Sequence, residues 1–392
     1  MTSEWHEVSL RELVGYMSKG IAPSYAEEAS ETTIRVLNQK CNRNFRISYG
    51  DSRLHDTLKK KVPPERYVKP DDILINSTGA GTAGRIAQIE DVPSATTIDG
   101  HMILIRSNGK VTQKFLGYAL KAHQWEVLQL DEGSTGQTEL NRDRLLDEIM
   151  INYPVSFDEQ NAIVGTLESI DRKLVVNEQL NDNLQQQAAA LFSSLYDRTN
   201  TEVRFTDLIQ ILGGGTPKTG ENTYWNGNIA FFTPKDVGTP YTLITEKTIT
   251  EEGLSHCNSR LYPVNTVFVT ARGTVGKVGM SGVPMAMNQS CYALVGKETH
   301  QLLVYFYTLK VVDRLKHKAS GAVFDAITTK DFESEQIMKL SDDDARAFLC
   351  IAEPMFQKVL NNCIENLRLS TLRDSLLPKL MSGEIDVSAV QL

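Results

Sequence analysis

Residues 156–197 read SFDEQNAIVGTLESIDRKLVVNEQLNDNLQQQAAALFSSLYD, a polar stretch in which apolar residues recur at alternating steps of four and three. That spacing is typical of a coiled-coil seam. Ser156 and Glu159 have the spacing of a capping box, which marks a helix start. We therefore predict one helix of about 38 residues, on the order of 57 Å long. Its predicted seam consists of Ile163, Leu167, Ile170, Leu174, Asn177, Asn181, Leu184, Ala188, Leu191 and Leu195.

A second stretch near the C-terminus repeats this pattern. Ser341 and Asp344 match the start of the central helix, and Pro354 predicts a kink or a later start near Glu353. Asn177 and Asn181 fall at the same seam positions as Asn362 and Asn366 in the second stretch. A buried Asn penalises pairings that place it opposite Leu or Ile, so these four Asn are predicted to fix the register of a helix pair. The alternative is that they face solvent at the edge of the seam. The second seam consists of Phe348, Ala352, Met355, Val359, Asn362, Asn366, Leu369, Arg373, Leu376 and Leu380.

The rest of the chain is also duplicated, with a period of about 190 residues. The turn GTAGR at 81–85 returns as GTVGK at 273–277. Short apolar runs between Gly, Pro, Asn and Asp predict strands, and a longer amphipathic run predicts a helix at 114–129. We expect an α+β fold in which two mixed α/β domains, 1–153 and 199–340, are each followed by a long helix, 154–198 and 341–392. The predicted strands of the first domain are 33–37, 72–75, 85–89 and 101–105.

Composition limits the function. The chain has 392 residues, of which 41% are hydrophobic, and a net charge of −8. A chain that grips DNA alone usually carries excess positive charge, so a nucleic-acid role would need local basic patches or partner subunits. The sequence shows neither a transmembrane run nor a signal peptide, which predicts a cytoplasmic protein. Five cysteines without a C-x-x-C pair disfavour disulfides and a zinc site.

The motifs of common catalytic sites are missing. No P-loop, dinucleotide-binding or zinc-binding pattern is met, so we expect no cofactor or metal to be bound by this chain. A self-contained enzyme is a competing interpretation, but it would require a catalytic constellation that the sequence does not show. What remains are glycine-rich loops with single basic residues, at 213–218 and 272–277, where backbone could approach a phosphate closely. Taken one by one, the glycines are more often explained by tight hairpins and the nearby aromatic residues by a core. Their duplication suits a two-part ligand such as a split DNA site, while a scaffold for protein ligands stays open as the alternative.

Several stretches resemble one known family. Residues 213–236, GGGTPKTGENTYWNGNIAFFTPKD, and 272–277, RGTVGK, are similar to the target recognition domain of specificity subunits of type I restriction-modification systems. Residues 372–385, LRDSLLPKLMSGEI, resemble the end of their distal conserved helix. In the first half, 19–25, KGIAPSY, and 72–85, DILINSTGAGTAGR, match the same pattern.

The resemblance implies a division of labour. Each domain would read one half of a bipartite DNA site through the major groove. The two helices would pair as an antiparallel coiled coil, set the distance between half-sites and dock two methyltransferase subunits. Those partners would bind S-adenosylmethionine and methylate adenine, and a restriction subunit, an ATP- and Mg-dependent motor and nuclease, would cut unmodified DNA.

The resemblance also implies which residues face DNA. One departure from the family pattern concerns the first half, which has only Asn38, Gln39 and Lys40 where the second half has Thr233 to Asp236. The predicted DNA-facing residues are Lys218, Thr219, Tyr224, Lys235, Arg272, Thr274 and Lys277 in the second domain, and Lys19, Ser24, Tyr25, Asn76, Thr78 and Arg85 in the first.

Overall fold

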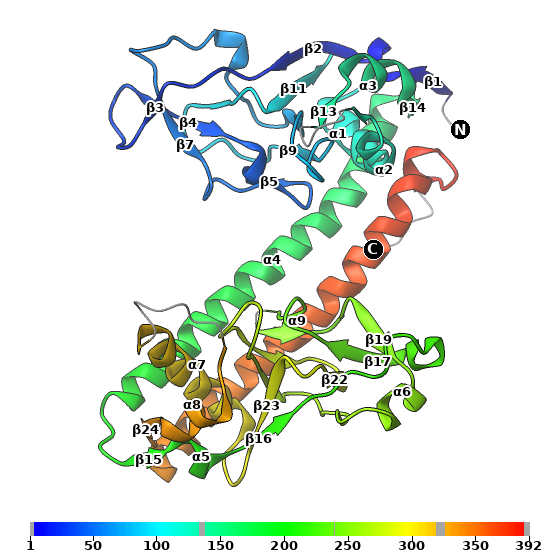
Figure 1. Cartoon of the computed structure of the whole chain (residues 1–392). Helices are drawn as coiled ribbons and strands as arrows, with labels where there is room; N and C mark the ends of the chain where they lie inside the picture. The colour runs from blue at the N-terminus through cyan, green and yellow to red at the C-terminus, as the bar shows by residue number, and fades with distance from the viewer. Residues whose placement is uncertain (1–3, 133–137, 239, 319–325, 388–392) are drawn as a thin grey trace. The chain divides into compact units, whose positions relative to one another are not determined.

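The computed structural model describes residues 4–132, 138–238, 240–318 and 326–387. The chain forms two compact units, a first unit of residues 1–172 with 369–392 and a second unit of residues 173–368. Each unit combines mixed sheets with a share of two 40-residue helices, α4 (Phe157–Tyr196) and α9 (Asp342–Met381) (Figure 1). The predicted α+β fold with two long helices is therefore confirmed.

The first unit contains two four-stranded sheets. One has the order β2-β11-β8-β9 with antiparallel neighbours, and the other has the order β10-β4-β7-β3, in which β10 runs parallel to β4. Helix α1 (Gln113–Ala122) shares one core with the first of these sheets, through Phe115 and Leu116. The strands are β2 (Val14–Lys19), β3 (Tyr25–Ala26), β4 (Thr33–Leu37), β7 (Arg53–Asp56), β8 (Ile73–Asn76), β9 (Ile86–Gln88), β10 (Thr96–Ile98) and β11 (Met102–Ser107).

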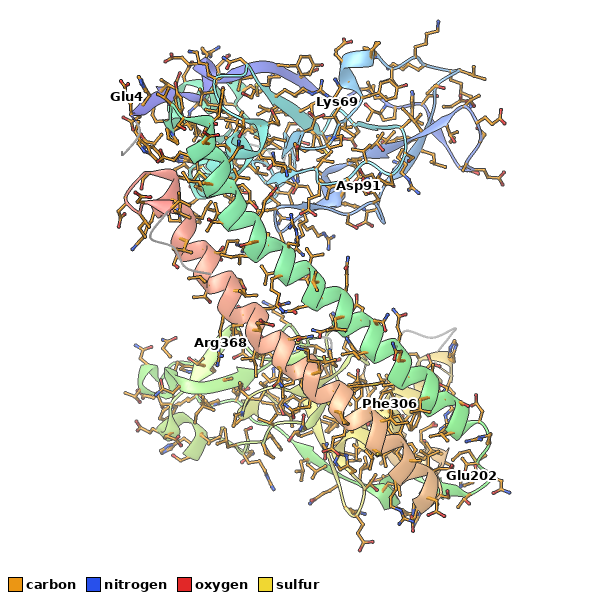
Figure 2. The ribbon with its side chains drawn as sticks, turned by 180° about the vertical axis from the view of Figure 1, so that it is seen from behind. Glu4, Lys69, Asp91, Glu202, Phe306 and Arg368 are labelled. Atoms are coloured by element: carbon orange, nitrogen blue, oxygen red, sulfur yellow. The ribbon has the colours of Figure 1, made fainter. Side chains whose placement is uncertain are left out.

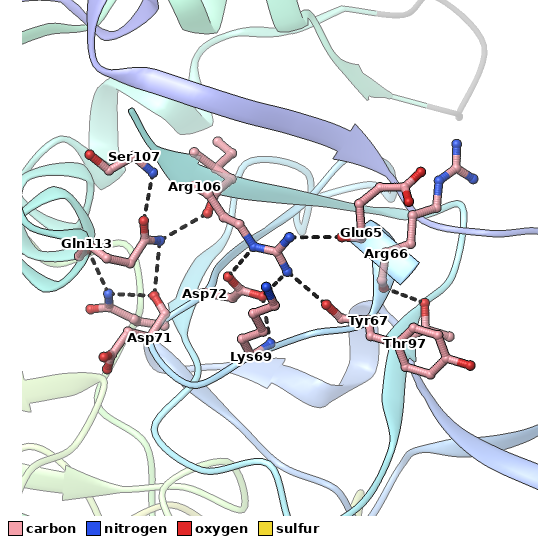
Figure 3. Close-up of polar contacts among 12 residues, drawn as sticks. Glu65, Arg66, Tyr67, Lys69, Asp71, Asp72, Thr97, Arg106, Ser107 and Gln113 are labelled. Atoms are coloured by element: carbon pink, nitrogen blue, oxygen red, sulfur yellow. Dashed lines mark hydrogen bonds and ion pairs between the residues drawn. The ribbon is translucent and has the colours of Figure 1, made fainter. Parts of the chain in front are cut away.

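An ion pair between Asp72 and Arg106 fastens the start of β8 to the neighbouring β11 (Figure 3). Both guanidinium-to-carboxylate hydrogen bonds are 2.7 Å long, and the same guanidinium donates to the carbonyl oxygens of Glu65 and Tyr67. The hydrogen bond to Asp72 raises the pKa of Arg106 above its usual range. The pair thus holds the segment before β8 against the sheet.

The second unit repeats this topology. Its larger sheet has the order β16-β23-β20-β21-β18, and its smaller sheet has the order β19-β17-β22 with β17 parallel to β22. The order β16-β23-β20-β21 and the parallel pair β17–β22 correspond to β2-β11-β8-β9 and β4–β10 of the first unit, so the predicted duplication is confirmed. Strand β18, which runs parallel to β21, is an addition of the second unit. The elements are β16 (Ile209–Gly213), β17 (Trp225–Phe232), β18 (Tyr241–Thr242), β19 (Lys247–Ile249), β20 (Val267–Thr270), β21 (Val278–Ser281), β22 (Met285–Met287), β23 (Cys291–Gly296) and the covering helix α7 (Gln301–Lys318).

Short elements complete each unit, and β1 with β14 and β15 with β24 form small antiparallel ribbons beside the long helices. They are β1 (Trp5–Ser9), β5 (Asn42–Arg43), β6 (Arg46–Ile47), β12 (Asp131–Glu132), β13 (Glu139–Leu140), β14 (Met150–Pro154), β15 (Glu202–Arg204), β24 (Gln336–Met338), α2 (Gln124–Leu128), α3 (Arg142–Glu148), α5 (Phe205–Leu208), α6 (Glu251–Ser255), α8 (Thr329–Ser334) and the 3-10 turns η1 (Leu10–Glu12), η2 (Gln39–Cys41), η3 (Pro64–Arg66) and η4 (Asn222–Tyr224).

Helix α9 begins at Asp342, where the hydroxyl of Ser341 accepts a hydrogen bond from the Asp344 N–H at 3.1 Å. The expected later start near Glu353 is therefore wrong. Pro354 and Cys350, one turn earlier, both lie on the exposed side of the helix. Proline removes the N–H that would pair with the Cys350 carbonyl, but it does so on the exposed side of the helix, while buried Ala352 and Phe356 pack on the other side.

The four seam Asn form two pairs within the second unit. Asn177 donates to the side-chain oxygen of Asn366 at 2.8 Å, and Asn362 donates to that of Asn181 at 2.8 Å. The first Asn of one helix meets the last of the other, which is an antiparallel match. Asn177, Asn181 and Asn362 are buried, so the alternative that they face solvent at the seam edge is wrong for these three. Their role in fixing register remains a prediction.

Among the described residues, no helix combines the length and apolarity that a membrane span requires.

Candidate nucleic-acid interface

The turn between β20 and β21 presents three of the predicted residues. Gly273 and Gly276 have φ of 82° and 75°, a left-handed conformation that favours glycine. The Thr270 hydroxyl locks the turn, because it donates to the Thr274 carbonyl at 2.5 Å and accepts from the Lys277 N–H at 2.9 Å. Arg272, Thr274 and Lys277 are all exposed on the resulting hairpin.

A second loop, Thr233 to Asp236, is fastened beside this turn. The Asp236 carboxylate accepts hydrogen bonds from the N–H groups of Thr233 and Glu246, at 2.8 and 2.7 Å. The Thr274 hydroxyl donates to the Pro234 carbonyl at 3.2 Å. The structure therefore brings together Lys235 of the loop with Arg272 and Thr274 of the turn, as the sequence resemblance implies for a shared surface.

The two loops enclose a hollow of about 350 Å³. Three of its lining residues, Lys235, Lys247 and Arg272, are cationic, and Glu246 is its one carboxylate, 3.5 Å from Lys235. This excess of positive charge, together with polar groups, suits a phosphate or the polar edge of a base. The hollow is lined by Thr233, Pro234, Lys235, Glu246, Lys247, Arg272, Gly273, Asn288 and Ser290.

The other predicted residues of the second domain do not line this hollow. Lys218 and Thr219 are exposed on the loop that follows β16, and the Lys218 carbonyl accepts from the Trp225 indole N–H at 3.2 Å. Tyr224 stacks on His256, with ring centroids 4.9 Å apart. These three residues therefore form a separate loop surface.

In the first domain, the matching cations are engaged within the protein. Lys19 forms an ion pair with Glu139, and the Arg85 guanidinium donates to the Gly81 carbonyl at 3.1 Å. The Thr78 hydroxyl is 2.7 Å from Nδ1 of His101. Thr78 also forms an isolated bridge with Glu139, so Lys19 and Thr78 share one neighbour.

Asn76 is not a DNA-facing residue in this structure. Its side chain is fully buried, its oxygen accepts from the Asn42 amide at 3.2 Å, and its nitrogen donates to the Gln39 carbonyl at 3.2 Å. The prediction is corrected because β8 is buried on both faces. An uninterrupted Ile-Leu-Ile-Asn run contains no alternation that would show which way the Asn points. Its counterpart in the second domain, Thr270, is also buried.

Tyr25 begins β3 of the other sheet of the first unit, and Ser24 directly precedes it, so neither is brought together with Thr78 and Arg85. The Ser24 N–H donates to Nδ1 of buried His55 at 2.8 Å. Tyr25 is exposed, and the Arg53 guanidinium lies 3.5 Å from its ring centroid. Arg53 thus joins Tyr25 in a surface on which a base could stack.

Sequence reasoning missed Arg53 in the first domain and Lys247, Asn288 and Ser290 in the second. Each lies far along the chain from the glycine-rich motifs, and only strand pairing brings it near. The one available signal was that Lys247 begins a short strand of the smaller sheet and Asn288 follows another. In the part of the chain that the structure describes, no group of three metal-ligating side chains is found.

The fold and the site place this chain in one class of protein, that of duplicated domains joined by long helices. It has duplicated mixed domains on paired long helices, and its second domain carries a basic surface built from loops. The family described as the type I restriction modification DNA specificity domain matches residues 2–186 and 198–339, so the chain belongs to this family, with two copies of its domain.

Three curated relatives are specificity subunits of type I restriction enzymes. The MjaIX subunit of Methanocaldococcus jannaschii is 31% identical over 127 residues, which are 31% of this chain and 29% of that protein. The HindI subunit of Haemophilus influenzae is 28% identical over 186 residues, 46% of this chain and 40% of that protein. The EcoR124I/EcoR124II subunit of Escherichia coli is 35% identical over 100 residues, 24% of each chain. The matches thus span less than half of each relative.

A solved structure shares the fold over nearly the whole length. The S subunit of the type I restriction-modification system from M. genitalium superposes with a TM-score of 0.61 at 17% identity, covering 97% of this chain and 96% of that chain.

Proposed function

We propose that this chain is the DNA-binding specificity subunit of a type I restriction-modification complex, and that each domain reads one half of a bipartite DNA site. The observation that carries the proposal is the basic turn and loop around Arg272 and Lys235 on a duplicated scaffold. Membership of a DNA specificity family favours this reading over a scaffold for protein ligands.

The proposal assigns the chemistry to other chains. Two methyltransferase subunits would dock on the helices, bind S-adenosylmethionine and methylate adenine, and a restriction subunit would use ATP and Mg. This chain would be non-catalytic and bind none of these cofactors. We expect the chain in the cytoplasm, a reducing compartment that suits its five free cysteine thiols. Binding of S-adenosylmethionine to the purified chain alone, measured by calorimetry, would contradict this division.

The DNA-facing assignment is tested with Arg272→Ala/Lys277→Ala in the complex with methyltransferase subunits. Both side chains are exposed, so folding should be unaffected, while DNA affinity should fall by about 10- to 100-fold. A matched control is Arg204→Ala/Lys297→Ala, which removes two exposed cations from the same unit. Register places Lys297 beyond the far end of β23, because Cys291 at the near end pairs with Thr270. Equal affinity of the two double variants would sink the assignment.

The spacer role of the helices has its own test. Insertion of one seven-residue repeat into both α4 and α9 should lengthen the gap between the two half-sites or abolish recognition, because seven residues add about 10 Å of helix. Methylated adenines mapped in a host that carries the variant give the readout. An unchanged methylation pattern would count against the spacer role.

A further inference from the structure

A second and larger hollow lies on the other side of the β20–β21 turn, within the second unit. It has a volume of about 660 Å³ and is lined by residues of α4, of α7 and of the turn itself. Its floor includes Phe192 of α4 with Phe306 and Val312 of α7. Sequence reasoning singled out one residue of this hollow, Lys277.

The rim of this hollow is cationic. Lys277 comes from the turn, and Lys310 and Lys316 come from α7. The one carboxylate of the lining is Asp313, which lies 3.7 Å from His317. The ammonium group of Lys310 lies 5.3 Å from the ring centroid of Tyr196. Within the described residues, no carboxylate forms an ion pair with any of the three lysines, so their charge is available to a ligand.

The turn and α7 approach each other closely at Gly276. A Cβ atom at this position would lie 2.6 Å from Cε of Lys316. The φ of 75° at Gly276 favours glycine, and without a Cβ atom the end of the Lys316 side chain lies against the same turn that presents Arg272 and Lys277. The turn therefore has cations on both sides, with Lys235 and Lys247 around the smaller hollow and Lys310 and Lys316 around the larger one.

The helix dipole accounts for only part of this cluster. Basic residues in a last helical turn complement the dipole, and Lys316, His317 and Lys318 occupy the last turn of α7. Lys318 also forms an ion pair with buried Glu335. Lys310, however, lies about two turns before the helix end, and Lys277 is not on the helix. A chain with a net charge of −8 that gathers unpaired lysines at one place points to an anionic ligand there.

We propose that this hollow, named the α7 hollow, holds a backbone phosphate of the same DNA duplex that the Arg272 turn contacts, with Lys277, Lys310 and Lys316 as its ligands. The inference rests on the proposed function. A DNA backbone is favoured over an acidic protein because cations line the hollows on both sides of the DNA-facing turn, and a polyanion that crosses the turn could contact both groups. Phosphate contacts carry no sequence information, so the α7 hollow adds affinity and orientation but no base preference.

The experiment compares Lys310→Ala/Lys316→Ala with wild type, each assembled with methyltransferase subunits. DNA affinity is measured on a duplex with the recognition site and on one without it, between about 50 and 200 mM salt. One lost phosphate contact should make the slope of log K against log salt shallower by about 0.9. Affinity for both duplexes should fall by the same factor, about tenfold at low salt. The control Arg204→Ala/Lys297→Ala should retain the wild-type slope, and Lys310→Arg/Lys316→Arg should restore it.

The outcomes separate this inference from the proposed function. An unchanged slope in a wild-type-like complex overturns the α7 hollow as a phosphate site and leaves the proposed function intact. Failure of the alanine variant to assemble with the methyltransferase subunits, with full rescue by arginine, assigns the hollow to an acidic protein segment and overturns the inference. A wild-type complex that binds neither duplex overturns the proposed function and the inference with it. Loss of thermal stability with an unchanged salt slope would mean that the lysines only stabilise the C-terminal end of α7, and it would overturn the inference.

Discussion

The two copies of the domain contact the long helices through different kinds of side chain, charged in the first unit and aromatic in the second. In the first unit, α1 contacts α4 through charged groups: Lys114 pairs with Glu168 at 2.6 Å, and Lys121 pairs with Asp171 at 3.1 Å. Arg373 of α9 adds a third contact, to Asp171 at 2.9 Å. Lys121 and Arg373 thus share the largely buried Asp171 carboxylate, and Lys114 pairs with a second carboxylate, Glu168, nearby.

In the second unit, aromatic rings occupy the corresponding interface. Phe192 of α4 stacks on Phe306 of α7 with centroids 5.0 Å apart, and it meets Tyr307 and Phe348 edge-on. Phe306 lies beside both long helices (Figure 2). The comparison teaches that sheet order and helix position survived duplication while the contact chemistry did not. It also means that acid and salt should weaken the first interface and leave the second nearly unchanged.

The largest effect is expected from Phe192→Ala. The side chain is 1% exposed and contacts four rings, so its removal should lower the free energy of unfolding by about 3–5 kcal/mol. Urea denaturation of the full chain, followed by tryptophan fluorescence and circular dichroism, measures the change. Phe157→Ala is the matched control, because Phe157 lies on the same helix but is 49% exposed. Similar losses in both variants would contradict an aromatic anchor at Phe192.

Asp171→Asn should cost somewhat less, about 2–4 kcal/mol, because it leaves the largely buried Lys121 and Arg373 without their carboxylate. Asp182→Asn, exposed on the same helix, is the control and should change stability little. Removal of the three charges around Asp171 together, as Asp171→Leu/Lys121→Met/Arg373→Met, should recover most of the loss, apart from the hydrogen bond that the Tyr118 hydroxyl donates to Asp171.

The pH dependence of this cluster follows from the carboxylate. Burial alone would raise the pKa of Asp171, but Lys121 and Arg373 outweigh it and hold that pKa below its usual range. A lowered pKa in the folded state gives stability that is present above about pH 4 and lost as pH falls through the folded value. Wild type should therefore lose more stability between about pH 4 and 2 than Asp171→Asn does. If wild type and Asp171→Asn lost the same stability between these pH values, the ion pairs of Asp171 would not be the cause of the acid sensitivity.

A smaller loss of stability is expected at the Asn pairs between α4 and α9. Asn181→Leu leaves the amide of buried Asn362 without its partner, which should cost about 1–3 kcal/mol. The side-chain oxygen of Asn362 already has no partner among the described residues. Asn181→Leu/Asn362→Leu should therefore be close to wild type in unfolding experiments, because both polar groups leave together. A double variant as unstable as the sum of two single variants would show that the Asn pair makes no direct contribution to pairing.

The sequence predicted the parts of this protein that depend on periodicity and repetition. The alternating steps from Ile163 to Leu195 gave the long helix, and GTAGR with GTVGK gave two β-hairpins in matching sheets. Patterning could not predict contacts made across the fold. The burial of Asn76 depends on what covers β8, and Lys247 and Asn288 reach the Arg272 turn only through strand pairing. The chemistry of the two helix interfaces was likewise invisible, because Lys121 and Phe306 both fit a helix that covers a sheet.

The smallest expected effect concerns DNA binding by the first domain. Lys19 already pairs with Glu139 at a partly exposed site, whereas Arg272 and Lys277 form no ion pair with a described residue. A DNA phosphate would have to displace or share that carboxylate, and an exposed ion pair contributes about 1 kcal/mol or less. Lys19→Ala should therefore weaken DNA binding by the assembled complex no more than about threefold. Glu139→Gln should strengthen binding by a similar factor, because it frees Lys19 and removes one negative charge. Weaker binding by Glu139→Gln would contradict this expectation. It would mean that the ion pair with Glu139 positions Lys19 for its contact with DNA.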